Sequence, residues 1–373
     1  MPTLFGKKIT QQELVRRIGH LSQVGGVDLI SRDNGRGRGV RWLEFQTGTG
    51  FIFRVSLDRG MDVGPCEYRG CSLAWIPPTD FASPWLFDQT DDFGWLRTAL
   101  GGLINTCGLV HVGNPEKANV GHYRFPAIEQ EKFGVHDRAA LTPARLIYSG
   151  ERWDGDVCYL EATGEINQAR VYGENLSLKR NYRAILGESR FTIHDTVKNQ
   201  GHLPTNHKLL YHINIGYPFV DEGSELLAPF FFSQSEMLVG GKPPGSEAAT
   251  RFIAPQDDWQ FEVFRHTMLP DRNGSVEVAI INPNLELGLY LIYQQHQFPV
   301  FLQTCLMAPG TYMVSLEPST TELGQNRMAS DGSLEYIQPG QTRQYSIEMG
   351  VLENTQQITA FSERIKTVIR TQD

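Results

Sequence analysis

Two polar side chains in this chain are suited to acid/base chemistry, and each lies in a segment that alternates as a β-strand does. His212 belongs to the segment 210–218, and Glu317 belongs to the segment 314–320. Imidazole and carboxylate are the two side chains best suited to moving protons near neutral pH. A β-framework that holds one of each is therefore a candidate acid/base site.

The surroundings of His212 favour a pocket over a core position. A lone histidine among Leu209, Leu210 and Ile213 is also what a hydrogen-bonded core residue looks like. Strand alternation, however, places Leu210, His212, Asn214 and Gly216 on one face. A face that carries an imidazole, an amide and a glycine is poor core and suits a ligand pocket.

Glu317 has two interpretations of the same kind. It follows the apolar run 313–316 and directly precedes Pro318, which predicts that the strand ends there. A carboxylate at a strand end is either an exposed surface residue or part of the rim of a site. Only the second reading gives it a chemical role.

Two further segments combine charges that suit a polyhydroxylated ligand. Arg59 and Asp62 flank Gly60 near a predicted strand end, where they form either a structural ion pair or a ligand clamp. His136 and Arg138 lie in a region without strand alternation. Each segment alone is weak as a signal, because charged pairs near strand ends also serve stability.

Composition restricts the class of partner. Among 373 residues, 34 are Lys or Arg and 42 are Asp or Glu, which gives a formal net charge of −8. Nucleic acids and anionic membranes need clustered cations, so we expect neither as a partner. No apolar run reaches membrane-spanning length.

The chain starts without the apolar segment of a signal peptide, and its five cysteines lack a disulfide framework, so we expect a cytoplasmic protein with reduced thiols.

Period-two alternation recurs along most of the chain. A hairpin is predicted over 41–46 and 51–57, and further strands over 154–198, 276–282, 288–293, 300–306, 312–316 and 343–351. A sustained meander with little helix predicts an all-β fold, a large antiparallel β-sandwich. Residues 80–135 are irregular and predict long loops over a site.

Helices are expected only at the two ends. Thr10 and Glu13 form a capping box, and Leu14, Ile18 and Leu21 follow at helical spacing, which predicts a short helix within a lead-in over 1–29. Apolar residues on one face of 355–370 predict a C-terminal helix packed on the body. We find no linker or internal repeat, and therefore expect a single domain over 1–373.

Taken together, these segments resemble the galactose mutarotase (aldose 1-epimerase) superfamily, and most closely its bacterial branch described as a domain of unknown function. The branch pattern runs Arg-Gly-Met-Asp, Thr-Cys-Gly-Leu, His-Gly-Arg with Pro-Ala, Leu-Tyr-His-x-Asn-x-Gly-x-Pro and Leu-Glu-Pro. In this chain the five motifs occur in that order at 59–62, 106–109, 136–138 with 143–144, 210–218 and 316–318. The resemblance covers roughly residues 30–350 and implies the superfamily's large antiparallel supersandwich.

The resemblance also implies roles for individual residues. In mutarotases a late glutamate is the general base and a central-strand histidine is the general acid, so Glu317 takes the first role and His212 the second. A loop histidine and an arginine bind the sugar, which corresponds to His136 and Arg59. The remaining residues expected to contact the sugar are Asp62, Arg138, Asn214 and Gln303.

The chain departs from the pattern in one loop. Where the pattern has His-Gly-Arg, the sequence reads His136-Asp137-Arg138, so an aspartate replaces a flexible glycine. The residues flanking His212 also differ from those of mutarotases. These departures leave the identity of the sugar open.

The implied activity is anomer interconversion by Glu317 and His212 acting on a small-molecule sugar or sugar derivative, with no metal and no cofactor. Three alternatives stay open at this point. The same pair could epimerise or isomerise a sugar at carbon, or the chain could be a non-catalytic carbohydrate-binding protein. Glycoside cleavage would need two carboxylates, for which Asp62 and Glu317 are the pair to consider. A homo-oligomer is also left open.

Overall fold

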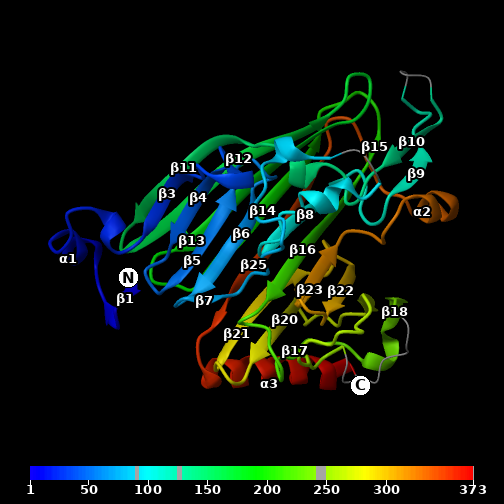
Figure 1. Cartoon of the computed structure of the whole chain (residues 1–373). Helices are drawn as coiled ribbons and strands as arrows, with labels where there is room; N and C mark the ends of the chain where they lie inside the picture. The colour runs from blue at the N-terminus through cyan, green and yellow to red at the C-terminus, as the bar shows by residue number, and fades with distance from the viewer. Residues whose placement is uncertain (89–91, 124–127, 241–248, 373) are drawn as a thin grey trace.

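Two antiparallel β-sheets face each other through most of the molecule (Figure 1). The computed structural model describes residues 1–88, 92–123, 128–240 and 249–372. The eleven-stranded sheet includes β7 (Cys71–Ser72), paired with β6, and otherwise runs in the order β18 (Glu236–Val239), β19 (Glu262–His266), β22 (Val300–Leu306), β23 (Met313–Ser319), β16 (Lys208–Gly216), β8 (Ile104–Leu109), β6 (Asp62–Tyr68), β5 (Phe51–Ser56), β4 (Arg41–Gln46) and β3 (Gly26–Ser31). The eight-stranded sheet runs in the order β11 (Arg145–Asp154), β12 (Val157–Ala169), β13 (Asn175–Ile185), β14 (Arg190–Asn199), β25 (Thr342–Leu352), β21 (Leu287–Gln294), β20 (Ser275–Asn282) and β17 (Glu225–Leu227).

Smaller elements complete the described part of the chain. Three short strand pairs are β1 (Thr3–Leu4) with β2 (Lys7–Lys8), β9 (Glu116–Asn119) with β10 (Gln130–Phe133), and β15 (Thr205–Asn206) with β24 (Tyr336–Ile337). The α-helices are α1 (Gln11–Val15), α2 (Asn326–Asp331) and α3 (Thr355–Gln372). Six 3₁₀ turns lie at Leu21–Gln23, Gly35–Gly37, Pro84–Leu86, Gly94–Arg97, Ala139–Leu141 and Phe232–Gln234.

The all-β antiparallel sandwich predicted from the sequence is therefore confirmed. The predicted hairpin forms between β4 and β5, where Phe45 pairs with Phe53. The later predicted strands correspond to β12 to β14, β20 to β23 and β25. Of the irregular region 80–135, residues 89–91 and 124–127 lie outside the described residues.

Aromatic side chains fill the space between the two sheets. Successive residues of a strand point to opposite faces, so every second residue of β4, β5, β13 and β14 reaches the interior. The rings of Phe45 and Phe53 lie 4.5 Å apart, and Phe53 lies 4.5 Å from Phe191 of the opposite sheet. Each such fully buried ring contributes about 1.5–3 kcal/mol to folding.

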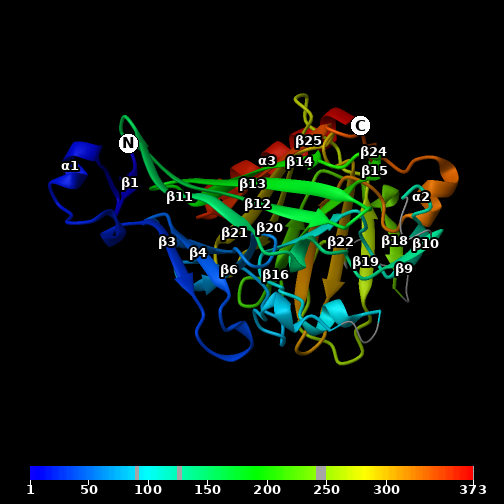
Figure 2. The same cartoon turned by 90° about the horizontal axis from the view of Figure 1, so that it is seen from above.

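The C-terminal helix α3 covers the outer face of the eight-stranded sheet, as both views show (Figures 1 and 2). Phe361 and Ile365 are buried against Ala279 of β20 and Leu352 of β25. The helix spacing of these apolar residues explains why the segment is helical, because it places them on one face. The helix predicted over 355–370 is confirmed.

The N-terminal helix is shorter than expected. Thr10 caps it as predicted: its Oγ1 accepts the Glu13 backbone N–H at 3.1 Å, and Glu13 in turn accepts the Thr10 N–H at 3.0 Å. The helix nevertheless ends at Val15, and Leu21 belongs to a separate 3₁₀ turn. Among the residues of α1 only Leu14 is buried, and a helix this short is marginal without a packed apolar face.

A buried charge cluster ties the two sheets together behind the candidate acid/base residues. Arg180 of β13 lies 2.6 Å from Asp195 of β14 and 3.3 Å from Asp62 of β6. Tyr211 of β16 donates its hydroxyl to Asp195 at 2.6 Å. Because paired charges in a low-dielectric interior need good geometry, this cluster fixes how the sheets sit on each other at this point.

Two predictions made from composition can be compared with the structure. Each of the five cysteines is a free thiol, as expected. Within the described ranges, no helix has the length and apolar character needed to cross a membrane. The single domain over 1–373 stays a prediction, although one apolar cluster includes residues from both sheets.

Candidate functional site

The two candidate acid/base residues lie on neighbouring strands and on the same face of the eleven-stranded sheet. The register of β16 and β23 pairs Leu210 with Ser319 and Ile213 with Leu316, which sets His212 opposite Glu317. On the other side of β16, His212 pairs with Asn105 of β8. The sheet thus aligns an amide, an imidazole and a carboxylate in one row across three strands, on the face directed away from the inter-sheet core.

The strand that carries Glu317 does not end where the sequence suggested. We expected the strand to stop before Pro318, but β23 continues to Ser319, and Pro318 pairs with Phe301 of β22. Proline lacks an N–H and cannot donate to a ladder. Glu317 therefore lies inside the sheet and not at a strand end.

His212 and Glu317 contact each other directly. Nε2 of His212 lies 3.3 Å from Oε1 of Glu317. The side chain of His212 is 16% exposed and that of Glu317 is 5% exposed, so the pair is largely removed from water but still reachable. Charge interactions are stronger in such a position than on the open surface.

Two hydroxyl groups hold the carboxylate of Glu317 in place. Thr304 of β22 donates its Oγ1 proton to Oε1 at 2.8 Å, and Ser315 of β23 donates to the same oxygen. Ser315 lies two residues before Glu317, so strand alternation brings both to one face. Sequence reasoning missed Ser315 and Thr304, although the spacing of Ser315 was a usable signal.

His136 approaches His212 from the loop that covers this face. The two imidazole rings lie 5.7 Å apart at nearly right angles, and the ring of Trp95 lies 5.4 Å from that of His136. Nδ1 of His136 accepts the Gly113 N–H at 3.3 Å, which leaves the proton of the neutral ring on Nε2. Burial, followed by the two neighbouring imidazoles of His212 and His111, lowers the pKa of His136 to about 3. His136 is therefore a neutral donor and not a cation.

Asp137 occupies the position where the family pattern has glycine, and it stabilises the loop there. His136 and Asp137 both have left-handed backbone conformations, with φ of 53° and 61°, which glycine adopts most easily and aspartate tolerates better than most residues. The carboxylate of Asp137 accepts the backbone N–H groups of Val110 and His111 and the side-chain amide of Gln168. These bonds hold the loop in the conformation that brings His136 to His212.

Arg138 is exposed and Asn214 is buried. Nε of Arg138 lies 3.9 Å from Oδ1 of Asp137, and its side chain is 59% exposed. Nδ2 of Asn214 donates to the backbone oxygens of Gly102 and His212, at 3.2 and 3.0 Å. Asn214 thus shares the face of His212 as predicted from alternation, and it anchors the segment at Gly102 to β16.

Arg59 and Asp62 do not join His212 and Glu317. Arg59 is fully buried, and its three kinds of nitrogen donate to the backbone oxygens of Ala140, Ala82 and Thr98 at 2.7–2.8 Å. Asp62 lies between the sheets, where it accepts bonds from Thr106 and Arg180. Burial lowers the pKa of Arg59 to about 10 and raises that of Asp62 to about 6. This geometry favours structural roles for both.

Gln303 lies on the other face of the sheet from Glu317. In the register of β22 and β23, Leu302 pairs with Glu317 while Gln303 pairs with Leu316, whose side chain belongs to the core. The amide of Gln303 bonds to the ring of His266 at 2.8 Å and donates to the backbone oxygen of Ala249. Its position gives it no direct access to the row that holds His212.

Two buried polar atoms in this row have no hydrogen-bond partner among the described residues. They are Nδ1 of His212 and Oδ1 of Asn105, which belong to residues paired across adjacent strands. Nδ2 of Asn105 donates to the Gly101 oxygen at 2.9 Å. Other buried polar atoms of the described residues, such as the Tyr293 hydroxyl, also lack a partner, but these two belong to directly paired residues, where one polar ligand would complete the bonds of both. Sequence reasoning missed Asn105.

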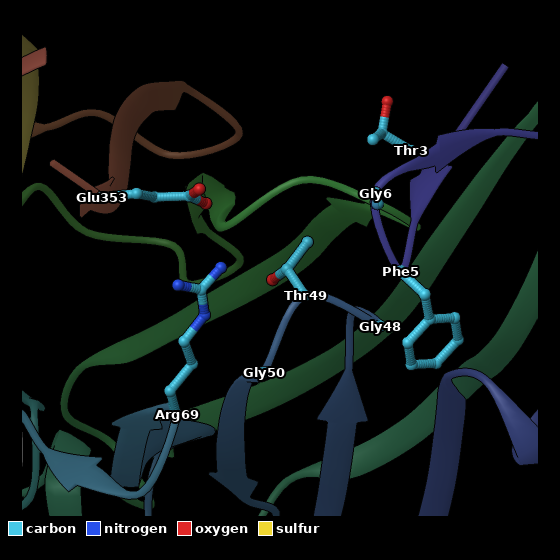
Figure 3. Close-up of a pocket in the computed structure, with 9 residues that line it drawn as sticks. Thr3, Phe5, Gly6, Gly48, Thr49, Gly50, Arg69 and Glu353 are labelled. Carbon is cyan, nitrogen blue, oxygen red and sulfur yellow. The ribbon is translucent and has the colours of Figure 1, made fainter. Parts of the chain in front are cut away.

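One cavity lies well apart from these residues. It has a volume of about 550 Å³ and is lined by turns and by the N-terminal strand pair. Arg69 and Glu353 point toward each other across it, with Thr49 beside them (Figure 3). None of the predicted site residues lines this cavity.

Comparison with known proteins gives one family match. A family model described as "Domain of unknown function (DUF4432)" matches residues 37–351. No curated protein matches the chain. Solved structures of similar fold include a "putative aldose 1-epimerase" from Klebsiella pneumoniae, with a TM-score of 0.81, 20% identity, and coverage of 92% of this chain and 87% of that one.

Two more distant structures have the same fold. A galactose mutarotase-like protein from Clostridium acetobutylicum has a TM-score of 0.58 and 10% identity, with 87% of this chain and 98% of that chain covered. Galactose 1-epimerase from Lactobacillus acidophilus has a TM-score of 0.55 and 9% identity, with 88% and 99% covered. At these identities the likeness establishes the fold and not the reaction.

Proposed function

Because this chain belongs to the family described as "Domain of unknown function (DUF4432)", whose description assigns no reaction, we propose its function from the geometry of the site. The chain acts as a sugar isomerase of the aldose 1-epimerase (mutarotase) type. The observation that carries this proposal is the 3.3 Å contact between His212 and Glu317 on a largely enclosed face of the sheet. The names of the structural neighbours agree with it.

The proposed reaction begins with ring opening. Glu317 removes the proton from the anomeric hydroxyl while His212 gives a proton to the ring oxygen, and the bond between the anomeric carbon and the ring oxygen breaks. The carbonyl then rotates, and the ring closes on its other face. Closure returns each proton to the group it came from, so the cycle leaves the enzyme unchanged. Each positioned proton transfer contributes typically ~10²–10⁴-fold.

The remaining residues orient the sugar. His136 offers a neutral N–H beside His212, and Asn105 offers an unpaired amide oxygen from the adjacent strand. Donors and acceptors at fixed angles suit hydroxyl groups, which both donate and accept. The roles of Asn214 and Arg138 in binding stay proposals, as do those of Arg59, Asp62 and Gln303, for which the geometry gives less support.

Glycoside cleavage by Asp62 and Glu317 receives less support than isomerisation. A cleaving pair must flank one bond, with the carboxyl groups about 5–10 Å apart in a shared pocket. Asp62 is fully buried between the sheets and bound to Arg180, while Glu317 faces the other side of the larger sheet.

A cytoplasmic location also belongs to this proposal, on the basis of the five free thiols.

The test is a substitution of the base. Glu317→Gln keeps the shape of the side chain and removes its ability to take a proton, so we expect anomer exchange to fall to the uncatalysed rate while sugar binding persists. Exchange would be followed by NMR in D₂O with a panel of aldoses, ketoses and acidic sugars. Glu286→Gln, at an exposed turn, is the matched control and should exchange anomers at the wild-type rate.

The same time course separates the alternatives. Anomer exchange without deuterium at carbon supports the proposal, whereas deuterium at a ring carbon indicates epimerisation or isomerisation through an enediol. Binding without either change indicates a carbohydrate-binding protein. Wild-type exchange rates in Glu317→Gln would contradict the role of this residue.

A further inference from the structure

A second cavity adjoins the loop that carries His136. It has a volume of about 470 Å³ and lies between the 3₁₀ turns Pro84–Leu86 and Gly94–Arg97 and the segment 132–142. Asp137 and Arg138 line it, directly after His136 in the chain. Trp95 also lines it and packs on the ring of His136, which in turn packs on His212. The cavity therefore neighbours the proposed site, and two packed rings, those of Trp95 and His136, lie between it and His212.

The two intervening rings place this cavity too far from His212 to hold the reacting sugar ring. Ring centres lie 5.7 Å apart between His212 and His136, and 5.4 Å apart between His136 and Trp95. A group bound against Trp95 in this cavity is thus separated from His212 by two ring contacts. A substrate that fills both places is longer than one sugar.

The apolar part of the lining is aromatic and in part exposed. Trp85, Phe87, Trp95 and Phe133 all contribute to it. The side chain of Trp85 is 79% exposed, so its ring is open to a ligand in this cavity. A pyranose presents a flat face of C–H groups that packs on such rings.

The polar part of the lining carries no net charge. It contains the carboxylates of Asp92 and Asp137 and the cations of Lys132 and Arg138. Lys132 is paired with Asp92, and Arg138 lies 3.9 Å from Asp137. An anionic ligand needs an excess of cations, which this cavity lacks. The exposed side chains of Asp92, Lys132 and Arg138 instead offer both acceptors and donors, which suits neutral hydroxyl groups.

We propose that this aromatic cavity is a second carbohydrate subsite, which binds a neutral sugar ring attached to the sugar that reacts at His212 and Glu317. The preferred substrates are then reducing disaccharides or longer oligosaccharides. This inference rests on the proposed function for the identity of the reacting ring. The stacking of the second ring on Trp85 is an additional claim that can be measured by itself.

The experiment compares Trp85→Ala with wild type in binding and in exchange. Ligand-observed NMR titrations would use glucose and galactose against maltose, cellobiose and lactose, with glucose 6-phosphate as the anionic probe. We expect at least one disaccharide to bind more tightly than its monosaccharide, and Trp85→Ala to weaken that disaccharide about tenfold. Affinity for monosaccharides should not change, and Trp85→Phe should restore much of the loss.

Two controls address the local environment and the fold. Leu86→Ala alters a neighbouring residue that is 48% exposed but does not line the cavity, and it should bind every probe as wild type does. Phe5→Ala removes an exposed aromatic ring from the distant cavity of Figure 3 and should be equally silent. Because Trp85 is exposed, its replacement should not affect folding, which a thermal melt checks.

The outcomes separate the subsite from the reaction. Disaccharide binding that depends on Trp85, without any anomer exchange, would overturn the proposed reaction and support the subsite. Anomer exchange with equal affinity for monosaccharides and every disaccharide would overturn the subsite alone. Preferential binding of glucose 6-phosphate, or an equal loss for all probes in Trp85→Ala, would also overturn it.

Discussion

At the scale of single residues, the site depends on how firmly Glu317 is held. Its Oε1 faces His212 and also receives the hydroxyl protons of Thr304 and Ser315. These hydroxyls act through the carboxylate and do not touch the sugar in our proposal. They are therefore positioning residues, and their effect should appear in the rate of the chemical step and not in substrate binding.

We predict that Ser315→Ala lowers kcat about ten- to a hundredfold and leaves KM nearly unchanged, because a small displacement of a reacting group is costly. The measurement is anomer exchange over a range of sugar concentrations. Ser315→Thr keeps the hydroxyl and should restore most of the rate. Ser319→Ala is the matched control on the same strand and face, since its hydroxyl binds the Thr321 backbone. A rise in KM with kcat intact would contradict the positioning role.

Asp137 gives a pH-dependent prediction. Burial raises the pKa of Asp137 to about 6, above the value of about 3.9 in an unfolded chain. The folded protein therefore holds this proton more tightly than the unfolded chain. The stability from this group is fully present below about pH 4 and is lost as the pH rises through 6.

Asp137→Asn removes this titration while keeping a side chain that tolerates the left-handed backbone. We predict that the free energy of unfolding of wild type, relative to Asp137→Asn, falls on the order of 2 kcal/mol between pH 4 and pH 7. Urea denaturation at both pH values measures it. Asp33→Asn, on the exposed surface, is the control. A relative stability that rises with pH would refute the assignment.

At the scale of elements, the buried side chain of Arg59 holds three loop segments together. This one side chain binds three backbone oxygens, in the segments that contain Ala82, Thr98 and Ala140. These are the segments that frame the aromatic cavity and lead into the loop of His136. The arginine fork suits this task because its donors diverge in one plane, which lysine cannot reproduce.

We predict that Arg59→Lys lowers the free energy of unfolding by about 2–5 kcal/mol, because buried carbonyl groups lose charged donors. Hydrogen exchange should accelerate in 79–88, 92–99 and 138–142 before the strands are affected. Arg145→Lys, at a side chain 71% exposed, should change neither quantity. If Arg59→Lys instead raised KM at constant stability, the sugar-binding role inferred from the family resemblance would be favoured.

At the scale of the whole molecule, the buried charge cluster connects the eight-stranded sheet to β16, the strand that carries His212. Arg180 of the eight-stranded sheet binds Asp195 and Asp62, and Tyr211, the neighbour of His212, binds Asp195. The two faces of β16 thus have different tasks. The face with His212 is directed away from the inter-sheet core, toward the proposed sugar site. The face with Tyr211 binds the strand to the opposite sheet.

We predict that Arg180→Leu destabilises the protein by about 3–5 kcal/mol, because it leaves two buried carboxylates without their cation. Combining it with Asp62→Asn and Asp195→Asn should recover part of this loss. Urea denaturation of the single and triple variants gives both numbers. Equal stability of Arg180→Leu and wild type would show that the cluster contributes nothing to holding the sheets together.

The sequence was informative where a pattern is local. Alternation in 210–216 placed His212 and Asn214 on one face, and the hairpin, the meander and the C-terminal helix followed from spacing alone. Such patterns work because the pleat and the helix repeat impose fixed periods. They failed at Pro318, where pairing with β22 extends the strand past a residue that normally interrupts one.

Which polar residues converge was decided by the tertiary structure. The sequence by itself predicted the sandwich and singled out His212 and Glu317 as candidates, whereas the placement of His136 beside them was implied only by the family resemblance. It could not determine that Arg59, Asp62 and Gln303 serve the interior while Asn105, Thr304 and Trp95 border the site. The physical reason is that a polar side chain satisfies its hydrogen bonds with whatever partner the fold brings near, and those partners lie tens to hundreds of residues away in the chain.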